Sequence, residues 1–218
     1  MTDQKTKFMQ KLTTDERELI QSLDSPYKIQ QFLDTVQYPS GPRNRSVLSV
    51  LQDRKAHCLD GGLFGAAMLS LIGHPAMIVD ILPEPGTDDD HVLAIYRVEG
   101  YWGAVAKSNF LGLRFREPVY KNLRELVMSY FEQYFNIESK KTLRGYTRPI
   151  ALSAYDRYFW MVNDEGVDII EKKLYKMSSI QIIPASIIQR LNPADKATYE
   201  SGLSISNPDG LFKPVSEK

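Results

Sequence analysis

The sequence has very little cysteine: Cys58 is the only one among 218 residues. A lone thiol excludes an intramolecular disulfide and fits a reducing compartment. A disulfide-stabilised secreted scaffold is therefore not expected, and we expect a cytoplasmic protein. The polar start of the chain, residues 1–7, has no apolar stretch behind it, so it does not predict a signal peptide.

The chain also has no excess of charge of either sign, since Lys+Arg and Asp+Glu each number 27. Surfaces that bind nucleic acid or anionic membranes usually carry net positive charge. Long apolar runs are missing too: the most apolar segment, residues 63–82, is interrupted by Gly73-His74-Pro75 and contains Asp80. We therefore expect no nucleic-acid partner and no membrane span.

The length favours one domain, residues 1–218, with room for a sizeable core. Hydrophobic periodicity predicts short helices over residues 14–24, 26–36 and 43–52. Residues 58–72 predict a further helix that is apolar nearly all round, which is typical of a central, buried helix. Its small residues, Gly61, Gly62 and Gly65 among them, permit close approach of a sheet.

Strand signals follow that helix. Residues 76–82, 91–98 and 101–107 are rich in β-branched and apolar side chains, and the turn Glu99-Gly100 predicts an antiparallel hairpin. Residues 119–135 predict a helix opened by Pro118. Residues 136–218 predict a helical C-terminal extension that starts with an irregular basic connection over 136–150.

Three residues suggest chemistry. Cys58 lies at a predicted helix start, where backbone N–H groups and the helix dipole stabilise the nucleophilic thiolate. His91 opens a predicted strand and Asn109 follows its antiparallel partner, so the hairpin brings the two residues side by side. The order gives a nucleophile, a base and a group that orients the base.

This arrangement resembles the transglutaminase-like superfamily of papain-type cysteine enzymes, and most of all its uncharacterised bacterial branch. The resemblance lies in residues 54–81, RKAHCLDGGLFGAAMLSLIGHPAMIVDI, and 88–110, DDDHVLAIYRVEGYWGAVAKSNF, within a core of about residues 25–135. It implies an α+β fold with a central helix on an antiparallel sheet and flanking N- and C-terminal helices. It also implies Cys58 as nucleophile and His91 as base.

The residue in the third position, after the cysteine and the histidine, departs from the superfamily pattern, in which this residue is usually Asp. The corresponding stretch offers Lys107, Ser108 or Asn109. Asn109 is the chemically sensible choice, because an amide oxygen accepts an imidazole N–H and a lysine ammonium cannot.

Other residues have weaker roles. Gln52 stands six residues before Cys58, the offset of an oxyanion-hole glutamine in papain-type enzymes, but it is also an ordinary polar helix position. The backbone N–H of Cys58 is the alternative oxyanion donor. Trp102, Arg114 and Arg116 are candidates to line a cleft, with core packing and surface ion pairs as alternatives.

No metal or cofactor is expected. Asp88-Asp89-Asp90 lacks the spaced ligands of a Ca²⁺ loop and predicts a solvated turn. We expect structural roles for His57 and His74.

The sequence thus favours thiol-dependent hydrolysis of, or acyl transfer from, a peptide or small amide, and it does not choose between water and an amine as acceptor. The departure at residues 107–109 keeps a second hypothesis open, a catalytically inactive domain of the same fold that serves as a binding or assembly module. The sequence leaves the oligomeric state undetermined.

Overall fold

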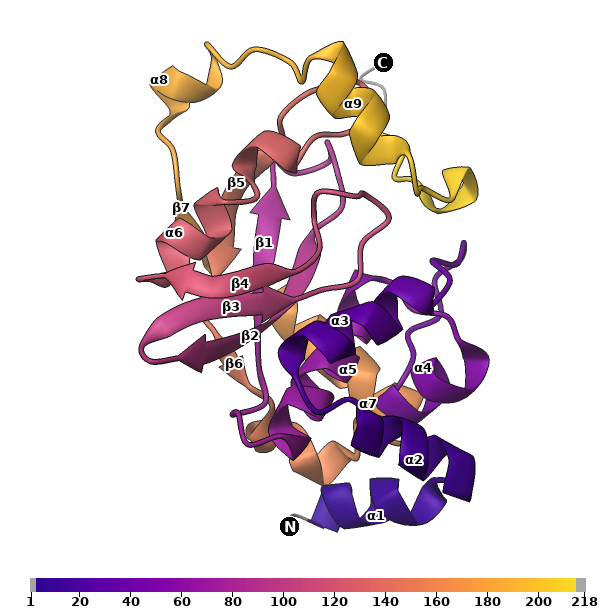
Figure 1. The fold of residues 1–218 in the computed structure, drawn as a ribbon. Helices are drawn as coiled ribbons and strands as arrows, with labels where there is room; N and C mark the ends of the chain where they lie inside the picture. The colour runs from indigo at the N-terminus through magenta and orange to yellow at the C-terminus, as the bar shows by residue number, and fades with distance from the viewer. Residues whose placement is uncertain (1–2, 215–218) are drawn as a thin grey trace.

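The computed structural model describes residues 3–214 as an α+β fold. Helix α5 (Cys58–Leu71) packs against a seven-stranded antiparallel sheet, as the sequence predicts. It is preceded by four helices, α1 (Asp3–Lys11), α2 (Thr14–Ser22), α3 (Pro26–Thr35) and α4 (Val47–Asp53). In Figure 1, α3, α5 and α7 lie together beside the sheet, while α1 and α9 lie at opposite ends of the molecule.

The sheet has the order β4-β3-β2-β1-β5-β7, with β6 also paired to β1. Its strands are β1 (Met77–Pro83), β2 (His91–Val98), β3 (Tyr101–Val105), β4 (Arg116–Tyr120), β5 (Leu143–Thr147), β6 (Ile150–Ala151) and β7 (Ser179–Gln181). The predicted hairpin is confirmed, because Val98 pairs with Tyr101 across the two-residue turn.

The predicted helix over residues 119–135 is wrong. The segment instead forms the end of β4, the short helix α6 (Leu123–Met128) and a 3₁₀ turn (Phe131–Gln133). Pro118 lies in β4, an edge strand, where one side of the ladder is unpaired and proline is tolerated. Asn122 then caps α6 by accepting the Glu125 N–H at 3.0 Å, which fixes a later helix start.

The predicted helical extension after residue 135 is also wrong in part, because it contributes three strands. Strands β5 and β6 both pair with β1, and β7 pairs with β5. Without them β1 would leave a row of backbone groups unpaired at the sheet edge. The basic residues of the segment concealed this strand pattern, since Arg144 stands between buried positions of β5. The rest is helical: α7 (Asp164–Leu174), α8 (Ala185–Ile188) and α9 (Lys196–Leu203).

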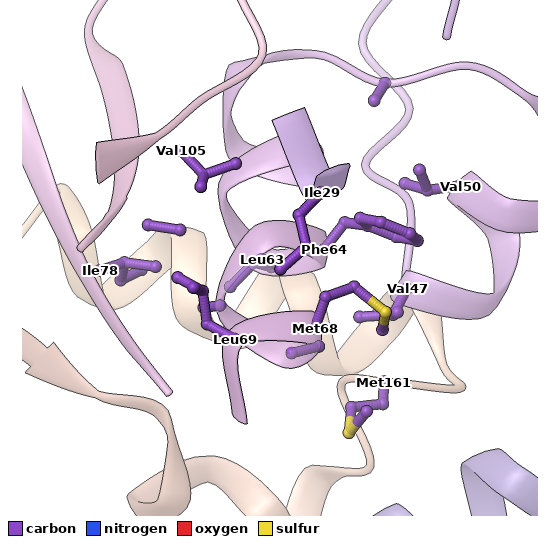
Figure 2. Packing of buried hydrophobic residues seen from close by; sticks show 14 of the residues in the cluster. Ile29, Val47, Val50, Leu63, Phe64, Met68, Leu69, Ile78, Val105 and Met161 are labelled. Atoms are coloured by element: carbon purple, nitrogen blue, oxygen red, sulfur yellow. The ribbon is translucent and has the colours of Figure 1, made fainter. Parts of the chain in front are cut away.

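Apolar side chains cover both faces of the sheet. On the α5 face, Ile78 and Val105 join a cluster with Phe64 and Met68 of α5, and Figure 2 shows these side chains gathered around that helix. On the other face a second cluster packs strands β1 and β2 against α6 and the aromatic residues that follow it. The start of β2 is consequently buried on both sides. Within residues 3–214, no helix is both long and apolar enough to cross a membrane.

Glycines on one side of α5 bring the helix very close to the sheet. A Cβ at Gly61 would stand 2.2 Å from the Cβ of Lys107, and one at Gly62 would stand 2.7 Å from Val92 Cγ1. Gly65 is less tight, with 3.0 Å to Ala94 Cβ. Any side chain at the first two positions would push the helix start, and Cys58 with it, away from β2.

Gly61→Ala should therefore destabilise the fold by about 1–3 kcal/mol, the usual cost of overpacking a core. Gly65→Ala should cost less, because the facing methyl group needs to move only a few tenths of an ångström. Urea unfolding of the two variants and the wild type checks this order. Equal stability of all three would show that the helix is not held at this distance.

Candidate active site

The start of α5 is fixed by its own first turn. Asp60 is fully buried and accepts the His57 N–H at 3.0 Å and the Arg45 N–H at 2.8 Å. His57 Nε2–H donates to the Pro39 carbonyl at 3.2 Å, and burial lowers the pKa of this imidazole. These bonds anchor the helix start to the loop before it, so His57 has a structural role here and Cys58 follows in a defined direction.

The thiol of Cys58 meets the start of β2. Its Sγ donates to the Asp90 carbonyl oxygen at 3.6 Å. Burial, and next the Asp90 carboxylate, raise the pKa of this thiol well above its ordinary value, whereas the Val92 backbone N–H lowers it. In the structure the resting sulfur is therefore a thiol, although the helix start alone favours a thiolate.

His91 is almost completely buried at the first position of β2. Its Nε2 lies 2.7 Å from the Leu113 carbonyl oxygen. A carbonyl only accepts hydrogen bonds, so the proton sits on Nε2 and the lone pair on Nδ1. Burial lowers the pKa of His91 to about 4, which keeps the ring neutral at pH 7.

Residues 107–109 have other partners in the structure. Lys107 Nζ donates to the carbonyl oxygens of Leu33 and Val36, and Ser108 Oγ accepts the Phe110 N–H at 2.9 Å. Asn109 Nδ2 donates to the Asn207 carbonyl at 2.9 Å, and Asn109 Oδ1 accepts the Asn207 N–H at 2.8 Å. The imidazole of His91 is held by a backbone carbonyl instead, a partner that has no signature in a sequence.

Cys58, His91 and Asn109 nevertheless line one cavity of about 40 Å³, with Tyr38, Ser108 and Leu113 also in its wall. The structure thus brings the three predicted residues together, without a hydrogen bond that joins one of their side chains to another. A space of this size holds water and excludes an acyl group.

A C-terminal segment, residues 206–212, closes this cavity; we call it the strap. Gly210 and Phe212 belong to the cavity wall. Besides its two bonds with Asn109, the strap donates from Ser206 Oγ to the Asn109 carbonyl and from Asn207 Nδ2 to the Tyr38 carbonyl at 2.9 Å. Asn109 is therefore the main anchor of the strap in this conformation.

Tyr38 is a residue that the sequence analysis missed. It lines the cavity, and the backbone N–H of Cys58 interacts with its hydroxyl. Burial and the neighbouring Cys58 raise the pKa of the phenol well above its ordinary value, so it stays a donor. The only sequence signal was the Tyr-Pro loop before α4, which is common in loops without any function.

The remaining candidates lie away from this cavity. Gln52 is exposed and its side chain interacts with Glu16. Trp102 packs under Arg97, 4.8 Å from the ring centroid to the guanidinium carbon. Arg114 forms an ion pair with Asp34 at 3.0 Å, and Arg116 stacks over Tyr130. These four side chains are not part of the wall of the cavity at Cys58.

Carboxyl groups crowd the turn before β2. Asp88 and Asp90 are buried enough to raise the pKa of each to about 6, and burial also raises that of Asp89. The predicted solvated turn is confirmed for Asp89, which is exposed, whereas Asp88 and Asp90 are half-buried. Thr142 Oγ1 donates to Asp88 Oδ2 at 2.7 Å. Among residues 3–214 no cluster of three or more His, Cys, Asp or Glu is arranged to hold a metal ion.

Neither a family model nor a curated protein matches the chain. Among solved structures it is similar to Legionella pneumophila LapG in an EGTA-treated form, with a TM-score of 0.35 and 16% sequence identity. The match covers 48% of this chain and 70% of that one. A likeness at this score carries no inference about activity, so the chemistry has to be derived from the site itself.

Substitution of Asp90 tests whether the pKa of its carboxyl group is raised in the folded protein. The native carboxyl, with its pKa raised to about 6, holds a proton more tightly than the unfolded chain, where Asp titrates near 3.9. Its contribution to stability is therefore complete at low pH and is lost as the pH rises through about 6. Asp90→Asn should leave stability nearly unchanged at pH 4 and raise it by on the order of 1 kcal/mol at pH 7, measured by urea unfolding.

Glu18→Gln, at an exposed position of α2, is the matched control and should change stability little at either pH. A gain for Asp90→Asn that is equal at both pH values would contradict a buried, ionisation-linked carboxyl.

Proposed function

We propose that this chain is a thiol-dependent amide hydrolase or acyltransferase of the transglutaminase-like superfamily, acting on a peptide or small amide. One observation carries the proposal: Cys58 and His91 line the same cavity, and the Leu113 carbonyl holds the proton of His91 on Nε2. The imidazole therefore offers a free lone pair on Nδ1, which a general base requires. The central helix that starts at the cysteine supports the superfamily.

The reaction would start from the neutral pair. As Cys58 Sγ attacks the amide carbon, its proton passes to His91 Nδ1 and the C–S bond forms while the carbonyl π electrons move to oxygen. The tetrahedral intermediate then collapses, the C–N bond breaks, and the imidazolium protonates the leaving amine. Water or a second amine attacks the resulting thioester and regenerates the thiol.

The charge that develops on the carbonyl oxygen needs hydrogen-bond donors. The Tyr38 hydroxyl is influenced by the Cys58 backbone N–H, and both residues line the same cavity. We propose that a substrate oxygen binds between them and accepts from both. Loss of one such donor usually costs about 10²–10³ in kcat.

In the closed state the Leu113 carbonyl, and not a side chain, orients the base. Asn109 would reach His91 only after the strap releases its amide and the ring leaves Leu113. On the side of Cys58 that faces His91, a substrate acyl group also needs more space than the 40 Å³ cavity offers. We therefore propose that the strap opens before the substrate binds.

Alkylation of Cys58 by iodoacetamide tests the base without a known substrate. His91→Ala should slow the reaction at pH 7 at least tenfold, because the thiol, with its raised pKa, then has no acceptor for its proton. His74→Ala is the matched control: its ring lies 5.5 Å from that of Tyr96, outside the cavity, and the rate should stay at the wild-type value.

A rate unchanged by His91→Ala would favour the second hypothesis, a binding or assembly module without catalysis. The raised thiol pKa and the small closed cavity are the observations on its side.

A second pair of variants tests what Asn109 does. Asn109→Ala removes two hydrogen bonds to the strap, each worth about 0.5–1.5 kcal/mol. We expect faster alkylation of Cys58, by about tenfold, because the open state is more populated. Ser206→Ala should act in the same direction and less strongly, since it removes one strap bond and leaves the Asn109 side chain intact.

The comparison separates the two roles. If Asn109→Ala slows alkylation while Ser206→Ala accelerates it, Asn109 orients His91 and the assignment to Leu113 is wrong.

A further inference from the structure

A groove leads away from Cys58. The thiol lines a second cavity of about 330 Å³, and this cavity shares Asp89, Asp90, Leu174 and Tyr175 with a third cavity of about 680 Å³. We call the two together the acidic groove. Unlike the small cavity under the strap, it offers the volume of a peptide side chain or a small ligand.

Negative charge dominates the lining of the groove. Two basic residues lie in the wall, Arg144 and His57. Arg144 is paired with Glu84 at 2.8 Å and bonded to the carbonyls of Lys141 and Leu143, while burial lowers the pKa of His57. The acidic lining residues are Asp80, Glu84, Asp88, Asp89, Asp90 and Glu171. The formal net charge of the whole chain is zero, so this excess is local.

The buried carboxyl group of Asp80 is the feature of the groove that indicates a ligand. Asp80 is 1% exposed, yet it lines the larger cavity, and within residues 3–214 its Oδ1 has no hydrogen-bond partner. A buried polar atom without a partner costs about 1–3 kcal/mol, so such atoms are rare in native structures. A donor bound in the groove would supply the missing partner.

The other walls suit the stem of a long cationic side chain. Leu174 and Met177 are apolar, and Tyr175 adds a largely exposed aromatic ring. Apolar surface covers the methylene groups of lysine or arginine, and an aromatic face attracts the charged end. A bare metal ion would use neither feature, and no metal-type cluster is found among the described residues.

We propose that the acidic groove binds an arginine or lysine side chain of a peptide substrate, with its cationic end at Asp80 and Asp90. The substrate part of this inference rests on the proposed function, whereas the binding of a cationic side chain does not. The cation would stand between the carboxyl groups that now repel one another, and the groove would select basic peptides.

The same cation would act on the nucleophile. Burial is the largest cause of the raised pKa of Cys58, and Asp90, Asp80 and Asp89 raise it further when they are ionised. Burial and the neighbouring Asp90 raise the pKa of Asp80 well above its ordinary value, so a bound cation would also favour ionisation of this carboxyl. Glu171 faces the cavity of Cys58 as well. His91 and His57 are neutral at pH 7, because burial lowers the pKa of each. A bound cation offsets the carboxylates, so substrate binding would favour loss of the thiol proton.

Binding of Nα-acetyl-arginine amide, followed by NMR titration of the full chain, tests the groove. Nα-acetyl-citrulline amide is the matched neutral ligand and should bind at least tenfold more weakly. Asp80→Asn and Asp90→Asn should each weaken binding of the arginine amide at least fivefold. Glu165→Gln, exposed on α7 and outside the groove lining, should leave it unchanged.

Equal binding of the two amides, no binding of either, or binding insensitive to Asp80→Asn and Asp90→Asn would overturn the proposal. So would spectral shifts at the groove with CaCl₂ alone and none with the arginine amide, which would make it a metal site. Faster alkylation of Cys58 in the presence of the arginine amide would support it.

Binding is also measured in Cys58→Ala, which keeps the groove and lacks the thiol. If the arginine amide binds there and to the wild type, while His91→Ala leaves alkylation unchanged, the groove stands and the proposed function fails.

Discussion

The close contact between α5 and the sheet is the constraint on which the rest of the structure depends. Gly61 and Gly62 let the first turn of the helix approach Lys107 and Val92 within distances that no side chain permits. Because Cys58 begins this turn and His91 begins β2, the contact is also what brings thiol and imidazole to one cavity. The same contact between α5 and the sheet therefore stabilises the fold and positions the thiol and the imidazole.

The environment of the thiol shows how burial can outweigh a helix dipole. A helix N-terminus stabilises a negative charge by about 0.3–1 kcal/mol, and one pKa unit corresponds to about 1.4 kcal/mol. The dipole thus lowers a thiol pKa by less than one unit in ordinary cases. Burial and the carboxylate of Asp90 act in the opposite direction and prevail, so the resting site holds a neutral pair.

The groups around the neutral thiol and the neutral imidazole have different effects on them. The imidazole of His91 is oriented by the Leu113 carbonyl, which belongs to a loop. Buried carboxyl groups are costly without a partner, and within residues 3–214 Asp80 Oδ1 has none. Such strain is typical of sites that are completed by a ligand, where stability is lost in exchange for recognition. The strap and the acidic groove then mark the closed side and the open side of Cys58.

The sequence by itself determined the parts that depend on local pattern. Apolar periodicity and a glycine turn predicted α5, β2 and the hairpin, and helix position singled out Cys58. Only the tertiary structure decided the rest, because long-range pairing has no local signal. Strands β5 and β6 pair with β1, β7 pairs with β5, and Pro118 is tolerated in an edge strand. The partner of His91 is a backbone carbonyl, and that of Asn109 is a segment almost a hundred residues later. A residue type can suggest a role, but its neighbours in space determine its charge, its partner and its access.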